Sequence, residues 1–415
     1  MVEPYHYVEL ENCMKRKTII LGVGLLALAA FLGWRFVRPL NIFVVAPAFE
    51  RPVDTSAAPA SLGDLKAESC GECHADFYDE WRTSMHSQAW TDPYFQADWQ
   101  FDGSQQVCKN CHTPLDRQQE HRVLGFRDDE KWDPILAPNP DFDPDLQHQG
   151  VTCAACHLRE GRILGPYGSQ SDAHPVERIS SGNQVCIQCH LVGGERWDTF
   201  FRFPPCGTVA EIRTGADEPT TRIGDIQGVD PATLGCVECY MPAVERPLVA
   251  GGEPRLTRQH LWRGGHDPEM VRQAVEVGFE RMSDKSDRYR LTITNVGAAH
   301  YVPTGTPDRH FVLSVRLLDQ DGAVLAEEER VLKRTVMWRP FIVDLWDTRL
   351  PPGRPRSEEF DFSGAELERA WTAEAVVRYG LVEEARLKRI GYQSEEPTTY
   401  EIYRKRLPLG DPRAG

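Results

Sequence analysis

The first strong pattern in the chain is an almost uninterrupted apolar run from Thr18 to Trp34, with basic residues at 15–17 before it and at Arg35 and Arg38 after it. A run of this length is just sufficient for a helix to cross a bilayer. Basic residues before such a run place the N-terminus in the cytoplasm and the rest of the chain outside it. The pattern therefore predicts one N-terminal transmembrane helix.

The same run also has the form of an export signal, with Ala27-Leu28-Ala29 as a cleavage triplet. Apolar residues continue beyond that triplet, so we favour an uncleaved membrane anchor that consists of residues 18–37. A cleaved signal is the alternative. Residues 1–17 are then a cytoplasmic N-terminus. Met14 is an alternative natural start, because a standard basic n-region opens there.

After residue 283 the pattern changes to alternating apolar and polar positions, which is typical of strands. The expected strands are 289–294, 310–318, 323–336 and 372–379. Asp321-Gly322 has the chemistry of a hairpin turn. Residues 283–415 are therefore predicted to form a β-rich, sandwich-like C-terminal domain without cysteine.

Between these two parts the periodicity is weak. Residues 38–63 are rich in proline and alanine, which predicts a linker. Residues 64–282 contain two clear helical stretches, 74–90 and 267–281, the second with Asp267 as its N-cap. The rest of this part is expected to be short helices and loops.

Composition narrows the class of protein. The formal net charge is −15, and phosphate binding needs a basic surface, so a nucleic acid is excluded as the expected partner. The most informative residues are the 12 cysteines, because ten of them form C-x-x-C pairs. Such clustering indicates a cofactor, a metal or a redox site rather than scattered thiols.

Four of the five pairs are followed directly by histidine. The four motifs are Cys70/Cys73/His74, Cys108/Cys111/His112, Cys153/Cys156/His157 and Cys186/Cys189/His190. C-x-x-C-H is the attachment signature of haem c: the two thiols form thioethers with the porphyrin, and the histidine becomes an axial ligand of the iron. We therefore predict four covalent haems c and a haem-packed domain over 64–282.

Two other readings of these pairs are weaker. Zinc ribbons also use repeated C-x-x-C pairs, but zinc does not require a histidine directly after the second cysteine. A thioredoxin-like redox pair would not recur along the chain. Thioether attachment and disulfides both fit an exported, oxidising location.

The fifth pair, Cys236 and Cys239, is followed by Tyr240 in place of histidine. Tyrosine does bind haem iron in catalases, so a fifth haem is one reading. We favour the other, in which the haem was lost and the thiols remain. Cys206 lies upstream as a disulfide partner for either thiol.

Several segments resemble the multihaem cytochrome c554-like family. They are CGECHADFYDEWRTSMHSQAW (70–90), HQGVTCAACHLREGRILGP (148–166), AHPVE (173–177), GGHDPEM (264–270) and NVGAAHYVPTGTPDR (295–309). The resemblance covers roughly 65–310 and is specific for a multihaem cytochrome, not for one activity. The chain differs from the family at Tyr240, because family members often have the sequence C-x-x-C-H-M-P where this chain has C-x-x-C-Y-M-P.

The resemblance also supplies the expected second axial ligands, which are His86, His148, His174, His266 and His300. Three other histidines, His121, His260 and His310, are less favoured. Met85 or Met241 could serve instead and would raise the potential of the iron. Because histidines are in excess, we expect mostly bis-histidine ligation and low potentials.

The function expected from these features is electron transfer on the periplasmic side of the bacterial inner membrane. Partners would be redox proteins, such as other cytochromes or a quinol-oxidising membrane complex, and the membrane itself through the N-terminal helix. The alternative is a multihaem oxidoreductase acting on a small nitrogen compound, which needs one haem with an open axial position. The sequence identifies no catalytic residue, so a carrier is favoured over an enzyme.

Overall fold

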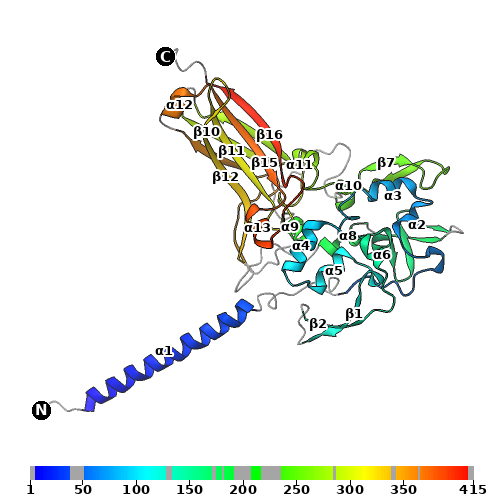
Figure 1. The fold of residues 1–415 in the computed structure, drawn as a ribbon, viewed down its shortest axis with the longest axis horizontal. Coiled ribbons are helices and arrows are strands. Elements are labelled where there is room, and N and C mark those ends of the chain that lie inside the picture. The colour runs from blue at the N-terminus through cyan, green and yellow to red at the C-terminus, as the bar shows by residue number, and fades with distance from the viewer. Residues whose placement is uncertain are drawn as a thin grey trace.

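The computed structural model describes residues 5–37, 51–127, 133–170, 174–179, 182–190, 207–215, 235–283, 287–337, 343–362 and 365–409. Three parts follow one another along the chain: one long helix, a region of short helices and small sheets, and a strand-rich region. Figure 1 shows the strand-rich part, yellow-green to red, beside the blue, cyan and green part that holds the cysteine motifs.

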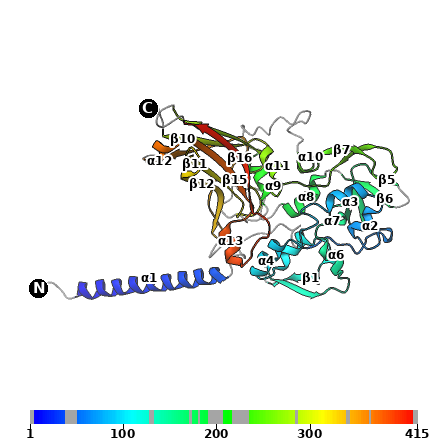
Figure 2. The ribbon, with the colours of Figure 1, turned by 45° about the horizontal axis from the view of Figure 1, so that its top comes forward.

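The long helix α1 (Tyr5–Val37) extends away from the rest of the molecule in both views (Figures 1 and 2). Its stretch Arg16–Trp34 has 19 residues and a mean hydropathy of 1.9, so it is long and apolar enough to cross a membrane. The side chains described along it are exposed. A signal sequence near the N-terminus would have the same length and composition.

Part of the expected linker is packed against the body of the protein. Val53 is buried, and its backbone donates to Pro114 O at 2.7 Å and accepts from Asp116 N at 3.0 Å. The hydroxyl of Thr55 donates to the Asp116 carboxylate. Residues from 51 onward therefore belong to the folded region, while 38–50 lie outside the described residues.

The middle region is built from short elements. Its helices are α2 (Ala67–Gly71), α3 (Ala75–Trp81), α4 (Pro93–Phe101), α5 (Gln106–His112), α6 (Pro144–His148), α7 (Cys153–His157), α8 (Asn183–His190), α9 (Thr208–Gly215), α10 (Cys236–Tyr240) and α11 (Pro268–Ala274), with 3-10 turns η3 (Ala60–Leu62) and η4 (Asp116–Gln118). Its strands are β1 (His121–Phe126), β2 (Pro134–Pro138), β3 (Leu158–Arg159), β4 (Arg162–Gly165), β5 (Ser169–Gln170), β6 (Pro175–Arg178), β7 (Ala243–Arg246) and β8 (Arg255–Arg258). They form the sheets β1-β2, β3-β4-β6-β5 and β7-β8.

Local chemistry explains where several of these helices begin. Asp92, Asp143 and Asp267 are the N-caps of α4, α6 and α11, and each carboxylate accepts backbone N–H bonds from the first turn. A proline follows each cap, where its missing N–H costs nothing. The expected N-cap at Asp267 is confirmed.

The two predicted helices are shorter than expected. The helix over 74–90 ends at Trp81, whose indole donates to Val151 O at 2.7 Å. The prediction of a helix over 267–281 is wrong beyond Ala274, because residues 275–281 form strand β9. Alternating inward positions such as Val277 and Phe279 suit a strand paired with a neighbour, and β9 pairs antiparallel with β10.

The strand-rich region contains most of the remaining chain. Its strands are β9 (Val275–Arg281), β10 (Arg288–Asn295), β11 (His310–Leu318), β12 (Val324–Met337), β13 (Val343–Asp347), β14 (Pro355–Asp361), β15 (Thr372–Gly380) and β16 (Thr399–Pro408), with helices α12 (Ala365–Arg369) and α13 (Glu384–Ile390). The orders are β14-β10-β9 in one sheet and β13-β12-β11-β15-β16 in the other. Each pairing in them is antiparallel.

One apolar cluster joins these two sheets. It includes Tyr289 and Leu291 from β10, Phe311 and Leu313 from β11, and Val377 from β15, all almost fully buried. The expected strands over 289–294, 310–318 and 372–379 fall within observed strands. β9 adds a strand on the N-terminal side of the expected boundary at residue 283.

Buried and half-buried ion pairs connect the two regions. Glu211 of α9 receives a 2.7 Å bond from Arg349, and both side chains are almost completely buried. At the junction of α4 and α13, Arg386 bonds to Asp98 at 2.6 Å and to Asp102 at 3.0 Å. These contacts hold the strand-rich region against the cysteine motifs.

Candidate functional site

Each C-x-x-C-H motif lies on or directly after a short helix. Cys153–His157 forms all of α7, and the second and fourth motifs end α5 and α8. In the first motif α2 ends at Gly71, and Cys73 and His74 follow in the turn before α3. Residues three apart on a helix share a face, so this local structure turns both thiols of a pair in one direction.

The motifs are close neighbours in space. The thiols of Cys70 and Cys153 lie within hydrogen-bonding reach of each other, which joins the first motif to the third. The Sγ of Cys111 lies 3.9 Å from the backbone oxygen of Cys189, which joins the second to the fourth. Cys186 of the fourth contacts Cys236 of the fifth pair.

Three motif histidines face a second histidine from elsewhere in the chain. The ring centroids of the pairs are 6.2 Å apart for His74 and His174, 6.5 Å for His190 and His86, and 6.1 Å for His157 and His260. Two imidazoles that bind one metal from opposite sides, each at about 2 Å through one nitrogen, place their ring centres about 6 Å apart. The three separations therefore fit an iron held between each pair.

Several of these histidine rings are oriented by a hydrogen bond between the ring Nδ1 atom and a backbone carbonyl oxygen. His74 Nδ1 lies 2.8 Å from Leu248 O, and His157 Nδ1 lies 2.8 Å from Leu164 O. A carbonyl only accepts, so Nδ1 carries the proton and donates, and Nε2 keeps its lone pair. This is the arrangement by which proteins orient a metal-binding imidazole.

His86 and His174 supply a further test of the fit. Within the described residues, the buried Nδ1 atom of each has no hydrogen-bond partner. Burial, with a smaller effect of nearby imidazoles, lowers the pKa of His86 to about 3, and burial lowers that of His112 to about 4. The rings of His86 and His112 are therefore neutral, which is the form that binds a metal.

The second motif differs from the other three. His112 Nδ1 lies 2.6 Å from Ala89 O, like its counterparts, but the ring stacks on Phe95 with centroids 3.6 Å apart. In the part of the chain that the structure describes, no second histidine ring faces it. Nearby, the Lys109 ammonium lies 5.5 Å from Trp90 and 5.4 Å from the Trp99 ring.

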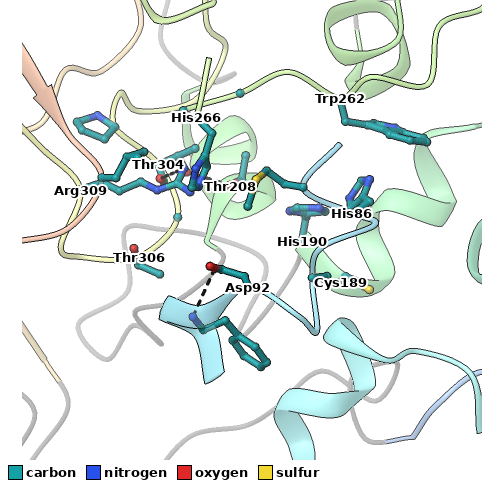
Figure 3. A pocket seen from close by; sticks show the side chains of 18 of the residues that line it. His86, Asp92, Cys189, His190, Thr208, Trp262, His266, Thr304, Thr306 and Arg309 are labelled. Carbon is teal, nitrogen blue, oxygen red and sulfur yellow. Dashed lines mark hydrogen bonds between the residues drawn. The ribbon is translucent and has the colours of Figure 1, made fainter. Parts of the chain in front are cut away.

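Three of the expected distal ligands lie elsewhere. His148 is exposed, with its Nδ1 2.7 Å from Pro144 O. His266 lies beside Arg309 on a cavity wall (Figure 3). His300 is buried, and its Nε2 lies 2.9 Å from the hydroxyl of Tyr240.

The cavity links the second motif, the fourth motif and the fifth pair. Its volume is about 2560 Å³, and Cys108, Cys189 and Cys239 all line it. His86, His190 and Trp262 lie together at one end, and Thr208, Thr304 and Arg309 lie at the other (Figure 3). A cavity of this size lined by paired thiols and neutral histidines fits bulky covalent cofactors better than one small ligand.

His260, which sequence analysis left among the less favoured histidines, lies opposite His157 in the structure. It follows strand β8 and meets His157 only because the β7-β8 hairpin folds back over the first helices. Its backbone N–H donates to Glu80 of α3 at 2.7 Å. No local motif marks it, so the sequence offered no signal beyond its being a histidine.

Comparisons with known proteins agree with this geometry. The family model described as cytochrome c554 and c-prime matches residues 69–131. Among solved structures, the chain is similar to a penta-heme cytochrome c552 from Thermochromatium tepidum, with 19% identity and a TM-score of 0.59, covering 84% of this chain and 100% of that one. A β-glucuronidase from glycoside hydrolase family 2 matches at 14% identity over 33% of this chain and 11% of that one, but its TM-score of 0.15 carries no argument. No curated protein matches.

The matched family model and the C-x-x-C-H motifs make this chain similar to multihaem c-type cytochromes, and the structural match shows a similar fold. Within that class, the chain resembles the cytochrome c554-like family. The matched residues 69–131 include the first two C-x-x-C-H motifs, so the earlier resemblance is confirmed on the residues that carry the chemistry.

Proposed function

We propose that this chain is a membrane-anchored periplasmic tetrahaem cytochrome that passes electrons between a membrane or periplasmic donor and an acceptor. The observation that carries the proposal is the set of three histidine pairs, each about 6 Å between ring centres and each beginning at a C-x-x-C-H motif. When bound, each haem supplies an iron that accepts and releases one electron.

In this proposal the chain's residues attach, orient and enclose the four haems. The thioether residues are Cys70, Cys73, Cys108, Cys111, Cys153, Cys156, Cys186 and Cys189, and the proximal ligands are His74, His112, His157 and His190. The distal ligands supported by geometry are His174, His86 and His260. His148, His266 and His300 stay predictions from family resemblance.

Two histidines at three of the four proposed irons favour electron transfer over catalysis. A filled sixth position leaves no site for a substrate, and bis-histidine ligation gives lower potentials than histidine–methionine ligation. Cys70 contacts Cys153, Cys111 contacts Cys189, and Cys156 of the third motif lies near Cys189 of the fourth. Together these neighbours connect all four motifs, which supports a continuous route.

Location and partners follow from the charge and the apolar helix. The helix α1 would hold the cytochrome on the periplasmic face of the inner membrane. A formal charge of −15, made more negative by haem propionates, favours basic redox partners. Other cytochromes or a quinol-oxidising complex are the expected classes.

The proposal is tested by haem stoichiometry. A pyridine haemochrome assay and the intact mass of the matured protein should both give four haems per chain. Peptide mapping should place one haem on each C-x-x-C-H motif. Fewer than four haems, or zinc in place of iron, would overturn the assignment.

A second candidate function is reduction or oxidation of a small nitrogen compound at a haem held by Cys108 and Cys111. The observation that favours it is His112, whose ring faces no described histidine and stacks on Phe95 instead. An iron with one protein ligand is high-spin and accessible. A high-spin signal that changes on adding nitrite, hydroxylamine or carbon monoxide would support this function, and uniformly low-spin spectra would remove it.

A further inference from the structure

The fifth C-x-x-C pair has the local structure of a haem site. Helix α10 (Cys236–Tyr240) has five residues, as has the helix formed by the third motif, Cys153–His157. Both Cys236 and Cys239 line the large cavity with the thiols of the second and fourth motifs. Backbone conformation and position alone therefore do not distinguish this pair from the other four.

The axial position does distinguish it. His300 Nδ1 lies 2.8 Å from Tyr301 O, so Nδ1 donates to that carbonyl and Nε2 is left as an acceptor. The Tyr240 hydroxyl donates to this Nε2 at 2.9 Å. An iron bound between oxygen and nitrogen at about 2 Å from each would hold these atoms about 4 Å apart. The hydrogen bond occupies the place of the metal.

His300 has little freedom to withdraw. Its backbone oxygen accepts from Asn295 Nδ2 at 2.8 Å, and the next residue, Tyr301, donates its N–H to Glu211 at 3.2 Å. Glu211 is in turn held by the buried Arg349 at 2.7 Å. Widening the Tyr240–His300 gap would disturb a buried charged network, which is costly to break. The residues present do not fit an iron.

We propose that the fifth pair carries no haem and is a dithiol that closes reversibly to a Cys236–Cys239 disulfide. In the step, the two thiols lose two protons and two electrons, and one S–S bond forms. The two electrons would be accepted by two ferric haems, one electron each, bound at the C-x-x-C-H motifs of the same chain. This assignment rests on the proposed haem attachment at the fourth motif.

The position of the pair supports exchange of electrons with that motif. Cys236 contacts Cys186, one of the two cysteines that would form thioethers at the edge of the fourth haem. α10 packs directly against α8, which carries that motif. C-x-x-C spacing is also the spacing of reversible disulfides in oxidoreductases. The pair would thus couple a two-electron thiol reaction to one-electron carriers.

The test labels thiols in the matured, full-length protein. Samples poised with ferricyanide or with dithionite are treated with iodoacetamide under denaturing conditions, and peptides are mapped by mass. We expect four haems, alkylation of both Cys236 and Cys239 in the reduced sample, and loss of at least ten-fold of that labelling in the oxidised one. In Cys239→Ser, Cys236 should label equally in both samples, since its partner is gone.

Several results would overturn the inference. They are a haem on the Cys236–Cys239 peptide, labelling of both thiols regardless of potential, or a disulfide of either thiol to Cys206, which lies outside the described residues. A fifth haem would leave the proposed electron-transfer function intact. Fewer than four haems would instead contradict that function, so the two failures are distinguishable.

Discussion

His157 and His260 face each other with nearly parallel rings, 6.1 Å between centroids and 21° between planes, although they are far apart in the sequence. Both have Nδ1 hydrogen-bonded to a backbone carbonyl, at 2.8 Å to Leu164 and 2.9 Å to Arg258. Each ring therefore presents its Nε2 lone pair. His260 lies outside any motif, yet its ring is oriented by a backbone carbonyl in the same way as that of His157.

The first prediction concerns His260. Replacing it with alanine should open one axial position, so that one of the four proposed haems changes from low-spin to high-spin. Optical and EPR spectra of the purified protein measure this change. His121→Ala is the matched control, because that ring is exposed on β1 and faces none of the motif histidines among the described residues. Identical spectra for His260→Ala and wild type would remove His260 as a ligand.

The second prediction concerns the buried pair Arg349–Glu211. Arg349 donates to Glu211 and to Asp347, each at 2.7 Å, and to Pro303 O at 2.9 Å. Arg349→Leu leaves the Glu211 carboxylate buried without its cation, which should lower the free energy of unfolding by about 3–5 kcal/mol. Chemical denaturation followed by circular dichroism measures this.

The exposed pair Lys388–Glu384 provides the control for that experiment. Its atoms are 2.8 Å apart, yet both side chains are more than three-quarters exposed. Lys388→Ala should leave the free energy of unfolding almost unchanged, because water screens so exposed a pair. Equal effects of the two substitutions would contradict the role given to the buried network.

The third prediction concerns pH and Asp308. Burial raises the pKa of Asp308 to about 6; Arg386 and Lys333 oppose this increase, while Asp98 and Glu383 add to it. A carboxyl whose pKa is raised on folding binds more protons in the folded state, so stability falls as pH rises from about 4 to about 6. Above that window the buried carboxylate destabilises the fold.

Asp308→Asn removes this effect. The free energy of unfolding of the variant, minus that of wild type, should increase between pH 4 and 6 and then level off, reaching at most about 3 kcal/mol. Denaturation curves at a series of pH values test it. A difference that is constant over that window would show that Asp308 does not titrate there.

The fourth prediction concerns partner choice. A surface of net charge −15 should attract a basic redox partner, and salt should weaken that attraction. The second-order rate of electron exchange with a small basic cytochrome, measured by stopped flow, should fall at least several-fold between low and physiological ionic strength. With an acidic partner of similar potential the rate should rise with salt, and a salt-independent rate in both cases would contradict surface steering.

The sequence predicted local features well and distant ones poorly. The thiols and proximal histidines of a motif lie within five residues, so their spacing alone specifies the chemistry. The partner of His157 depends on where the β7-β8 hairpin folds, and no nearby residue encodes that. Likewise, the alternating apolar positions Val275, Val277 and Phe279 are assigned from sequence to the helix that begins after Asp267. They form a strand because β9 pairs with β10, and that pairing is not encoded by neighbouring residues.

The packing of Val53 against Leu115 sets a mechanical limit on the molecule. This contact fastens the chain only a few residues from His112, and only residues 38–52 separate Val53 from the end of α1. Covalent geometry limits such a segment to a reach of about 55 Å. If α1 is embedded as proposed, the second haem stays within that radius of the bilayer, and donors and acceptors must come to it there.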